Sequence, residues 1–256
     1  MARYAAAPDT SVTLVTCTLG EEGEIIPPEL RLLVAGESDQ LGGYRIGELD
    51  AACAALGVTD RRFLGGAGRF RDSGMALAGH GVRAAPLPKL HPRAFAAPEA
   101  FDEEVDALAA VLADVRPEVV VTYAADGTYG HPDHVRAHQI TVAAVARVPS
   151  RLVFAVIGRA SLDAGLAALR GSPFRIPQPD ELPAVPEGMI TTRLDVRAQR
   201  AQRIAAMRAH ATQVLVAPDE QTFAMSNLVA QPILDVEEYV AADGRSSSGL
   251  LGDGDG

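Results

Sequence analysis

Residues 119–146 read VVVTYAADGTYGHPDHVRAHQITVAAVA and combine a strand, a turn and a helix in one stretch. The first five residues are apolar or β-branched, which predicts a strand buried within a sheet. The pair Asp126-Gly127 suits a turn, and a helix is expected from Pro132 to Ala146, with proline in its first turn. A strand that leads through a short loop into a helix is the building unit of α/β folds.

The segments on either side repeat this alternation. Further strands are expected over 12–17, 62–64 and 151–157, and further helices over 44–56, 101–115 and 194–210. The alternation predicts an α/β fold with a Rossmann-like, mostly parallel sheet flanked by helices. Sites in such sheets form in the loops at the carboxyl ends of strands. Residues 1–7 are expected to be helical, so the usual first strand of the sheet is missing from the expected order.

Composition limits the class of protein. The 256 residues, 48% of them hydrophobic, are enough for one globular domain over 1–242, and the Gly-, Ser- and Asp-rich stretch 243–256 is expected to be a disordered tail. The net charge of −10 and the lack of a basic patch argue against nucleic-acid or membrane-surface partners. Cys17 and Cys53 form no disulfide or metal pattern, which favours a cytoplasmic location. The sequence does not determine the oligomeric state.

The run Tyr129-Gly130-His131-Pro132-Asp133-His134 carries the sharpest chemical signal. Two histidines three positions apart can lie on the same side of a helical turn. Neutral imidazole is a good zinc ligand, and a neighbouring carboxylate such as Asp133 can orient it. An imidazolium can also stabilise an oxyanion or protonate a leaving amine, and the Tyr129 phenol could donate to the same oxyanion. The alternative is a helix start with two surface histidines and a packed tyrosine ring, and a functional site is favoured.

Three other features are weaker when taken one at a time. The loop over 18–24 carries three carboxylates that could bind polar substrate hydroxyls, or it could be a solvated acidic loop. Arg45 could clamp a hydroxyl-rich or anionic ligand, although a surface salt bridge is more common. Asp72, after the Gly-rich run 65–68, could accept a hydroxyl or serve as an ordinary turn carboxylate.

Together, five segments resemble the LmbE-like family of zinc-dependent amino-sugar deacetylases, and most closely its mycothiol-pathway members, which deacetylate N-acetylglucosaminyl-inositol. The segments that carry the resemblance are 15–24, 39–49, 65–75, 129–134 and 210–214. The resemblance implies a small-molecule amino-sugar substrate and one zinc ion per subunit, although iron can occupy similar sites. A sister activity of the family is the mycothiol S-conjugate amidase, and the segments 15–24 and 65–75 favour the deacetylase.

The resemblance also implies a role for individual residues. His134 corresponds to the third zinc ligand, and His131 to the electrophilic or acid histidine. Asp133 corresponds to the partner that orients His131, and Tyr129 to the tyrosine beside the oxyanion. The implied sugar or inositol contacts are Arg45, Asp72 and Glu24.

One departure from the family pattern is large. The family carries His-Pro-Asp-Asp-Glu after its first strand, which supplies two of the three zinc ligands and the general-base aspartate, and this sequence contains no such run. Zinc would then bind weakly, and the acetamide carbonyl and its attacking water would be poorly activated. We expect Met1 to be an internal start within a longer, intact enzyme. The alternative is a catalytically silent, sugar-binding relative.

Overall fold

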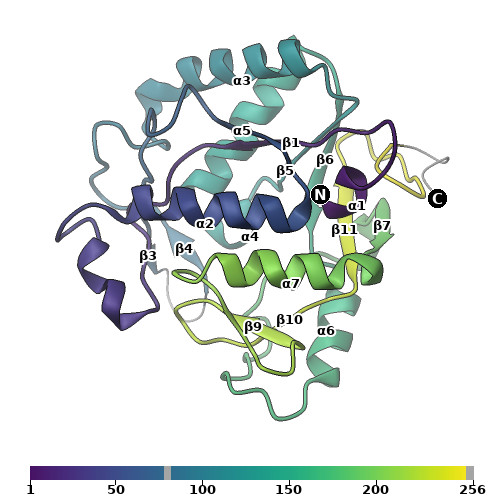
Figure 1. Ribbon diagram of the computed structural model, residues 1–256. Helices are drawn as coiled ribbons and strands as arrows, with labels where there is room; N and C mark the ends of the chain where they lie inside the picture. The colour runs from purple at the N-terminus through teal and green to yellow at the C-terminus, as the bar shows by residue number, and fades with distance from the viewer. Residues whose placement is uncertain (78–81, 252–256) are drawn as a thin grey trace.

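The computed structural model describes residues 1–77 and 82–251. Its larger sheet has four strands in the order β5 (Val119–Tyr123), β6 (Arg151–Val156), β11 (Val236–Ala241) and β7 (Thr192–Asp195). Strands β5 and β6 are parallel, while β11 runs antiparallel to both of its neighbours. Helices cover these strands (Figure 1), so the α/β class predicted from the sequence is confirmed.

The other parallel pair stands apart from this sheet. Strand β1 (Thr13–Thr16) pairs with β2 (Asp60–Phe63), and within the described residues no strand ladder joins β1 to β5. The parallel pairing is therefore present in two separate pieces. In the part of the chain that the structure describes, strand β5 has a neighbour on one edge only, and Val121 and Tyr123 are 47% and 38% exposed. The strand occurs where the sequence predicts it, but the prediction of full burial is wrong.

Two pairs of helices pack around the strands. Helix α2 (Leu41–Leu56) lies beside α7 (Arg200–Ala209), and α3 (Phe101–Val115) packs on α5 (Pro132–Arg147) (Figure 1). The helix expected from Leu194 begins later because its first residues belong to β7. No helix in the described ranges is long and apolar enough to cross a membrane.

Short elements complete the chain. The remaining helices are α1 (Ala2–Ala5), α4 (Gly127–Gly130) and α6 (Arg159–Ala168), with 3₁₀ turns η1 (Pro28–Leu33), η2 (Pro98–Ala100), η3 (Glu187–Met189) and η4 (Arg197–Gln199). The remaining strands are the β3 (Ala76–Leu77) and β4 (Ala84–Ala85) pair and the group β8 (Leu215–Val216), β9 (Thr222–Ala224) and β10 (Gln231–Pro232).

A single hydrophobic cluster links the two strand pairs. Helices α3 and α5 supply most of its buried residues, and the fully buried Phe95 also belongs to it. Val15 and Cys17 at β1 and Val120 on β5 pack against the same cluster. Among the described residues, the two pieces are thus joined by side-chain packing on shared helices and not by strand hydrogen bonds.

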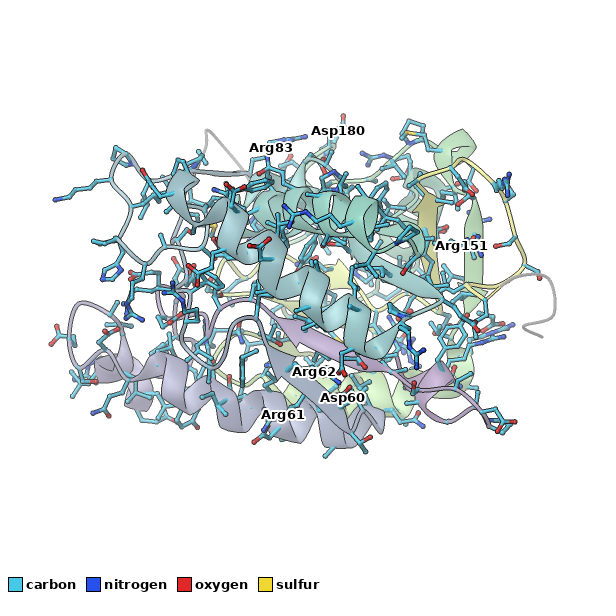
Figure 2. All side chains as sticks on the ribbon, turned by 90° about the horizontal axis from the view of Figure 1, so that it is seen from above. Asp60, Arg61, Arg62, Arg83, Arg151 and Asp180 are labelled. Carbon is cyan, nitrogen blue, oxygen red and sulfur yellow. The ribbon has the colours of Figure 1, made fainter. Side chains whose placement is uncertain are left out.

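The C-terminal segment is more ordered than the sequence predicts. Leu250 is buried, its N–H donates to the Tyr4 hydroxyl at 3.1 Å, and Arg151 donates to its carbonyl at 2.7 Å. Figure 2 labels Arg151 on the side of the molecule where this segment passes. The expected disorder is therefore wrong for 243–251, and the rest of the expected tail, 252–256, lies outside the described residues.

A charged pair is buried between α3 and α5. Glu104 is fully buried, and its carboxylate lies 3.6 Å from Nε of Arg136. Arg136 donates its hydrogen bonds to the carbonyls of Ala96 and Ala97, at 2.9 and 2.8 Å. Neither carboxylate oxygen of Glu104 has a hydrogen bond to the described residues. Burial raises the pKa of Glu104 from 4.5 to about 8.

This pKa shift predicts how stability changes with pH. The folded state holds the Glu104 proton more tightly than the unfolded chain, so this group lowers stability as pH rises from about 4.5 to 8. Glu104→Gln removes that titration. We expect the variant to gain stability relative to the parent by more than about 1 kcal/mol between pH 5 and pH 8, since one pKa unit is about 1.4 kcal/mol.

Urea unfolding at the two pH values measures this difference. The exposed Asp102→Asn change on the same helix is the control and should show no change in its effect between pH 5 and pH 8. Parallel pH profiles for the parent and Glu104→Gln would contradict the assignment.

Candidate functional site

A tight turn after β5 presents Tyr129 over the start of α5. Gly127, Thr128 and Gly130 all have positive φ, and Asp126 accepts a hydrogen bond from the Thr128 N–H at 3.0 Å. A Cβ on Gly127 would lie 2.9 Å from the Cβ of His134, and one on Gly130 would lie 2.7 Å from the Ala84 carbonyl oxygen. Only glycine fits these two positions, and together they hold the tyrosine against the helix.

The side chains predicted from the 129–134 run come together. The Tyr129 ring centroid lies 5.1 Å from that of His134 and 5.9 Å from that of His131, and the two imidazoles are 5.0 Å apart. Tyr123, the last residue of β5, stacks flat on His134 at 3.9 Å. The sequence did not single out Tyr123, because its position predicts only a strand end.

Hydrogen bonds distinguish the two histidines. Nδ1 of His134 lies 3.2 Å from the Gly127 carbonyl, which can only accept, so this nitrogen carries the proton and Nε2 of the neutral ring carries a lone pair. Nδ1 of His131 accepts from the Asp133 N–H at 3.1 Å, so its neutral ring carries the proton on Nε2. His134 therefore offers a ligand nitrogen, and His131 offers a donor.

Burial keeps these groups in the required protonation states. It lowers the pKa of His134 to about 4, with a contribution from the neighbouring His131, and it lowers the pKa of His131. Burial also raises the pKa of Tyr129 well above its ordinary range. At neutral pH the site thus presents two uncharged imidazoles and a protonated phenol.

Two aspartates adjoin the histidines. Ser73 donates its N–H to Oδ2 of Asp133 at 3.2 Å, and Gly74 donates its N–H to Oδ1 of Asp72 at 2.9 Å. Burial and the charge of Asp72 raise the pKa of Asp133, and the same charge acts on His131. Oδ1 of Asp133 is buried without a partner among the described residues. Asp72 therefore belongs to the same site as the histidines.

Arg45 is engaged by the protein itself. Each of its three nitrogens donates to a protein oxygen: Nε to Thr212 Oγ1 at 3.2 Å, and the other two to the carbonyls of Gly20 at 2.5 Å and Glu24 at 3.0 Å. The residue is buried, and it joins the loop after β1 to the loop after α7. This geometry favours a structural clamp, and a contact between Arg45 and substrate stays a prediction.

In the acidic loop, the buried carboxylate belongs to Glu21 and not to Glu24, the residue that the resemblance implies as a substrate contact. The Glu24 side chain is exposed, and its carbonyl is the group that contacts Arg45. Glu21 is buried instead, and one of its oxygens accepts from the Leu19 and Asp72 N–H groups. The sequence placed three carboxylates in this loop, but nothing in their spacing shows which one points inward.

The described residues do not complete a metal site. Nε2 of His134 has the chemistry of a zinc ligand. However, no three His, Cys, Asp or Glu side chains in ranges 1–77 and 82–251 are grouped so that they could hold a metal ion. The two further ligands that the resemblance implies have no counterpart in this group.

The sequence of this chain is similar to a family model and to known deacetylases. The family described as "PIG-L: GlcNAc-PI de-N-acetylase" matches residues 1–145. The 1D-myo-inositol 2-acetamido-2-deoxy-alpha-D-glucopyranoside deacetylase 1 of Saccharopolyspora erythraea is 54% identical over 95% of this chain and 84% of its own length. The corresponding deacetylase of Actinosynnema mirum is 55% identical over 95% of this chain and 86% of its own.

Solved structures support the fold. A deacetylase of teicoplanin biosynthesis, in complex with teicoplanin, superposes with a TM-score of 0.54 at 19% identity, covering 94% of this chain and 91% of that one. The zinc-inhibited form of teicoplanin deacetylase Orf2 gives 0.51 at 20% identity, covering 94% and 92%. With a family match over more than half of its length and relatives above 50% identity, the chain belongs to the PIG-L, or LmbE-like, de-N-acetylase family.

Proposed function

We propose that this protein is a deacetylase that hydrolyses the acetamide of 1D-myo-inositol 2-acetamido-2-deoxy-α-D-glucopyranoside, releasing acetate and the free amino sugar in mycothiol biosynthesis. Relatives with 44–55% identity carry this activity in their names. The observation in the structure that supports it best is the pair His131 and His134, which present a donor nitrogen and a lone-pair nitrogen side by side. Amide hydrolysis needs both kinds of group.

The donors fit the charge that develops during the reaction. As the acetamide carbonyl is attacked, negative charge accumulates on its oxygen. The Tyr129 hydroxyl and the Nε2–H of His131 are both protonated at neutral pH and lie over the same turn of α5. They are the candidates to hold that oxygen. His131 would have to take up a second proton before it could protonate the leaving amine, because a neutral imidazole does not release its Nε2 proton to an amine.

Asp72 and Asp133 supply acceptors. The Asp133 N–H to His131 Nδ1 bond holds that imidazole in place. Asp72, whose Oδ1 accepts from the Gly74 N–H, is the proposed acceptor for a sugar hydroxyl. Arg45 and Glu24 shape the adjoining loop, through the hydrogen bond from the Arg45 guanidinium to the Glu24 carbonyl. As proposed substrate contacts, these two residues rank below Asp72.

The metal part of the proposal concerns His134. This side chain would hold zinc through Nε2, and a single protein ligand holds the ion weakly compared with the usual three. We therefore expect this 256-residue chain to be a slow enzyme. An engineered N-terminal strand and loop that carry His-Pro-Asp-Asp-Glu would supply the remaining ligands and the general base, which alone contributes about 10²–10⁴-fold in rate.

Acetate release tests the assignment directly. The 256-residue chain and a chain extended at its N-terminus by the strand and His-Pro-Asp-Asp-Glu loop of a family deacetylase are given zinc and the acetamido-sugar inositol, with a mycothiol S-conjugate as the competing substrate. We expect the extended chain to hydrolyse the sugar inositol faster than the conjugate, and the short chain to be slower by at least about 10²-fold.

Three other results would change the assignment. Preference for the S-conjugate would make the protein an amidase. Binding of the sugar without hydrolysis by either chain would make it a silent relative. Equal rates for the two chains would contradict the account of the missing ligands.

Removal of His134 should weaken zinc binding. We expect His134→Ala to raise the zinc Kd of the 256-residue chain at least about tenfold, because loss of groups that merely support a ligand already costs about 10–100-fold. Chelator competition measures the Kd. His91→Ala, an exposed histidine in another loop, is the matched control and should leave the Kd unchanged. An unchanged Kd in His134→Ala would show that zinc binds elsewhere.

Loss of the Tyr129 hydroxyl should act on the chemical step. Tyr129→Phe keeps the ring against His134 and removes one donor, so kcat of the extended chain should fall by about 10²-fold or more with little change in KM. Steady-state kinetics separate the two constants. A change confined to KM would indicate that the hydroxyl contacts the substrate and not the developing oxyanion.

A further inference from the structure

We propose that Glu21 is a positioning residue that fixes Asp72 in the active site. The proposal rests on the proposed function only in treating Asp72 as a sugar contact. Glu21 accepts hydrogen bonds from two backbone N–H groups and acts through the backbone of its neighbours. Its buried carboxylate links the loop after β1 to the segment after β2 through hydrogen bonds.

The hydrogen bonds of Glu21 carry this inference. Oε2 accepts from the Leu19 N–H at 3.2 Å and from the Asp72 N–H at 3.0 Å, which brings together residues 51 positions apart in the chain. The side chain is only 7% exposed. A buried backbone N–H that loses its acceptor is costly, so this carboxylate strongly favours one arrangement of the two loops.

Asp72 is held from both sides by this arrangement. Its N–H is bound by Glu21, while its own Oδ1 accepts from the Gly74 N–H at 2.9 Å. With the backbone and one carboxylate oxygen both restrained, the charge of Asp72 is held where it acts on His131, Tyr129 and Asp133. Substrate-binding groups are effective only when their neighbours lock their orientation.

Helix α2 makes room for Glu21 and compensates its charge. A Cβ on Gly42 would lie 2.8 Å from Cγ of Glu21 and 3.0 Å from Cβ of Leu19, so glycine is needed at this buried helical position. Three residues later on the same helix, the Arg45 guanidinium interacts with the charges of Glu48, Asp72 and Glu21. A buried carboxylate requires such a counter-charge.

The two glycines Gly42 and Gly47 provide a matched pair of variants. Gly42→Ala pushes on Glu21 and Leu19, whereas Gly47→Ala is the same change on the same helix with nothing within 4 Å. The direct variants are Glu21→Ala, which removes the acceptor, and Glu21→Gln, which keeps one carbonyl oxygen in a side chain of the same length.

The experiment uses the 256-residue chain and two readouts. Titration calorimetry gives the Kd for the acetamido-sugar inositol, and hydrogen exchange gives the protection of the Asp72 amide; thermal melting confirms that each variant is folded. We expect Glu21→Ala and Gly42→Ala to weaken binding about tenfold, the scale of one lost hydrogen bond, and to lower the protection of the Asp72 amide by at least as much. Glu21→Gln should recover most of the sugar affinity and most of the Asp72 amide protection. Gly47→Ala should match the parent in both.

Several results would overturn the proposal. One is a folded Glu21→Ala variant whose Asp72 amide stays as protected as in the parent. Another is the same sugar Kd and the same Asp72 amide protection in Gly42→Ala and Gly47→Ala. This comparison holds whether or not Glu21→Ala folds. If the parent binds no sugar, the proposed function fails, and the exchange of the Asp72 amide alone then decides the role of Glu21.

Discussion

The hydrogen bond from the Asp133 N–H to Nδ1 of His131 is the interaction on which the site depends. It caps helix α5, satisfying one of the backbone donors that every helix start leaves unpaired. The same bond places the proton of the neutral imidazole on Nε2, so a structural requirement of the helix sets the chemistry of the side chain. His134 follows within the first turn of the helix. Its Nδ1 donates to the Gly127 carbonyl, which leaves the lone pair of the neutral ring on Nε2.

The site lies beside the two separate pairs of parallel strands, β1–β2 and β5–β6. Helices α3 and α5 span β1 and β5, which share a hydrophobic cluster without a strand ladder between them in the described part of the chain. Three buried carboxylate oxygens, two of Glu104 and one of Asp133, have no hydrogen-bond partner there. Burial raises the pKa of the Cys17 thiol, and the charges of Asp133 and Glu104 raise it further, so all three groups lie in one region beside the end of β1. Orphaned acceptors are rare in folded proteins, so this region is where the structure is least complete in its hydrogen bonding.

Local signals predicted the elements but not the connections between them. The helix over 101–115 and the strand over 119–123 occur where the sequence predicts them, because periodicity and β-branching are properties of neighbouring residues. The grouping of Tyr129, His131 and His134 was predictable for the same reason. The clamp made by Arg45 was not, because Thr212 lies 167 positions away in the chain and nothing local shows that the two meet. Glu21 was missed because loops have no period that separates an inward carboxylate from an outward one.

The charge balance of the site favours a neutral, hydroxyl-rich substrate. Glu21, Glu48 and Asp72 are all buried carboxylates that interact with the charge of Arg45, and Asp133 adds an acidic group on the other side of Asp72. Arg45 is buried, and each of its nitrogens already donates to Thr212 or to a carbonyl, so the protein itself holds this guanidinium in place. A phosphate brought to Asp72 would meet repulsion, whereas sugar or inositol hydroxyls can donate to it. The same field would stabilise the ammonium group that deacetylation creates, since a cation gains from nearby carboxylates what an anion loses.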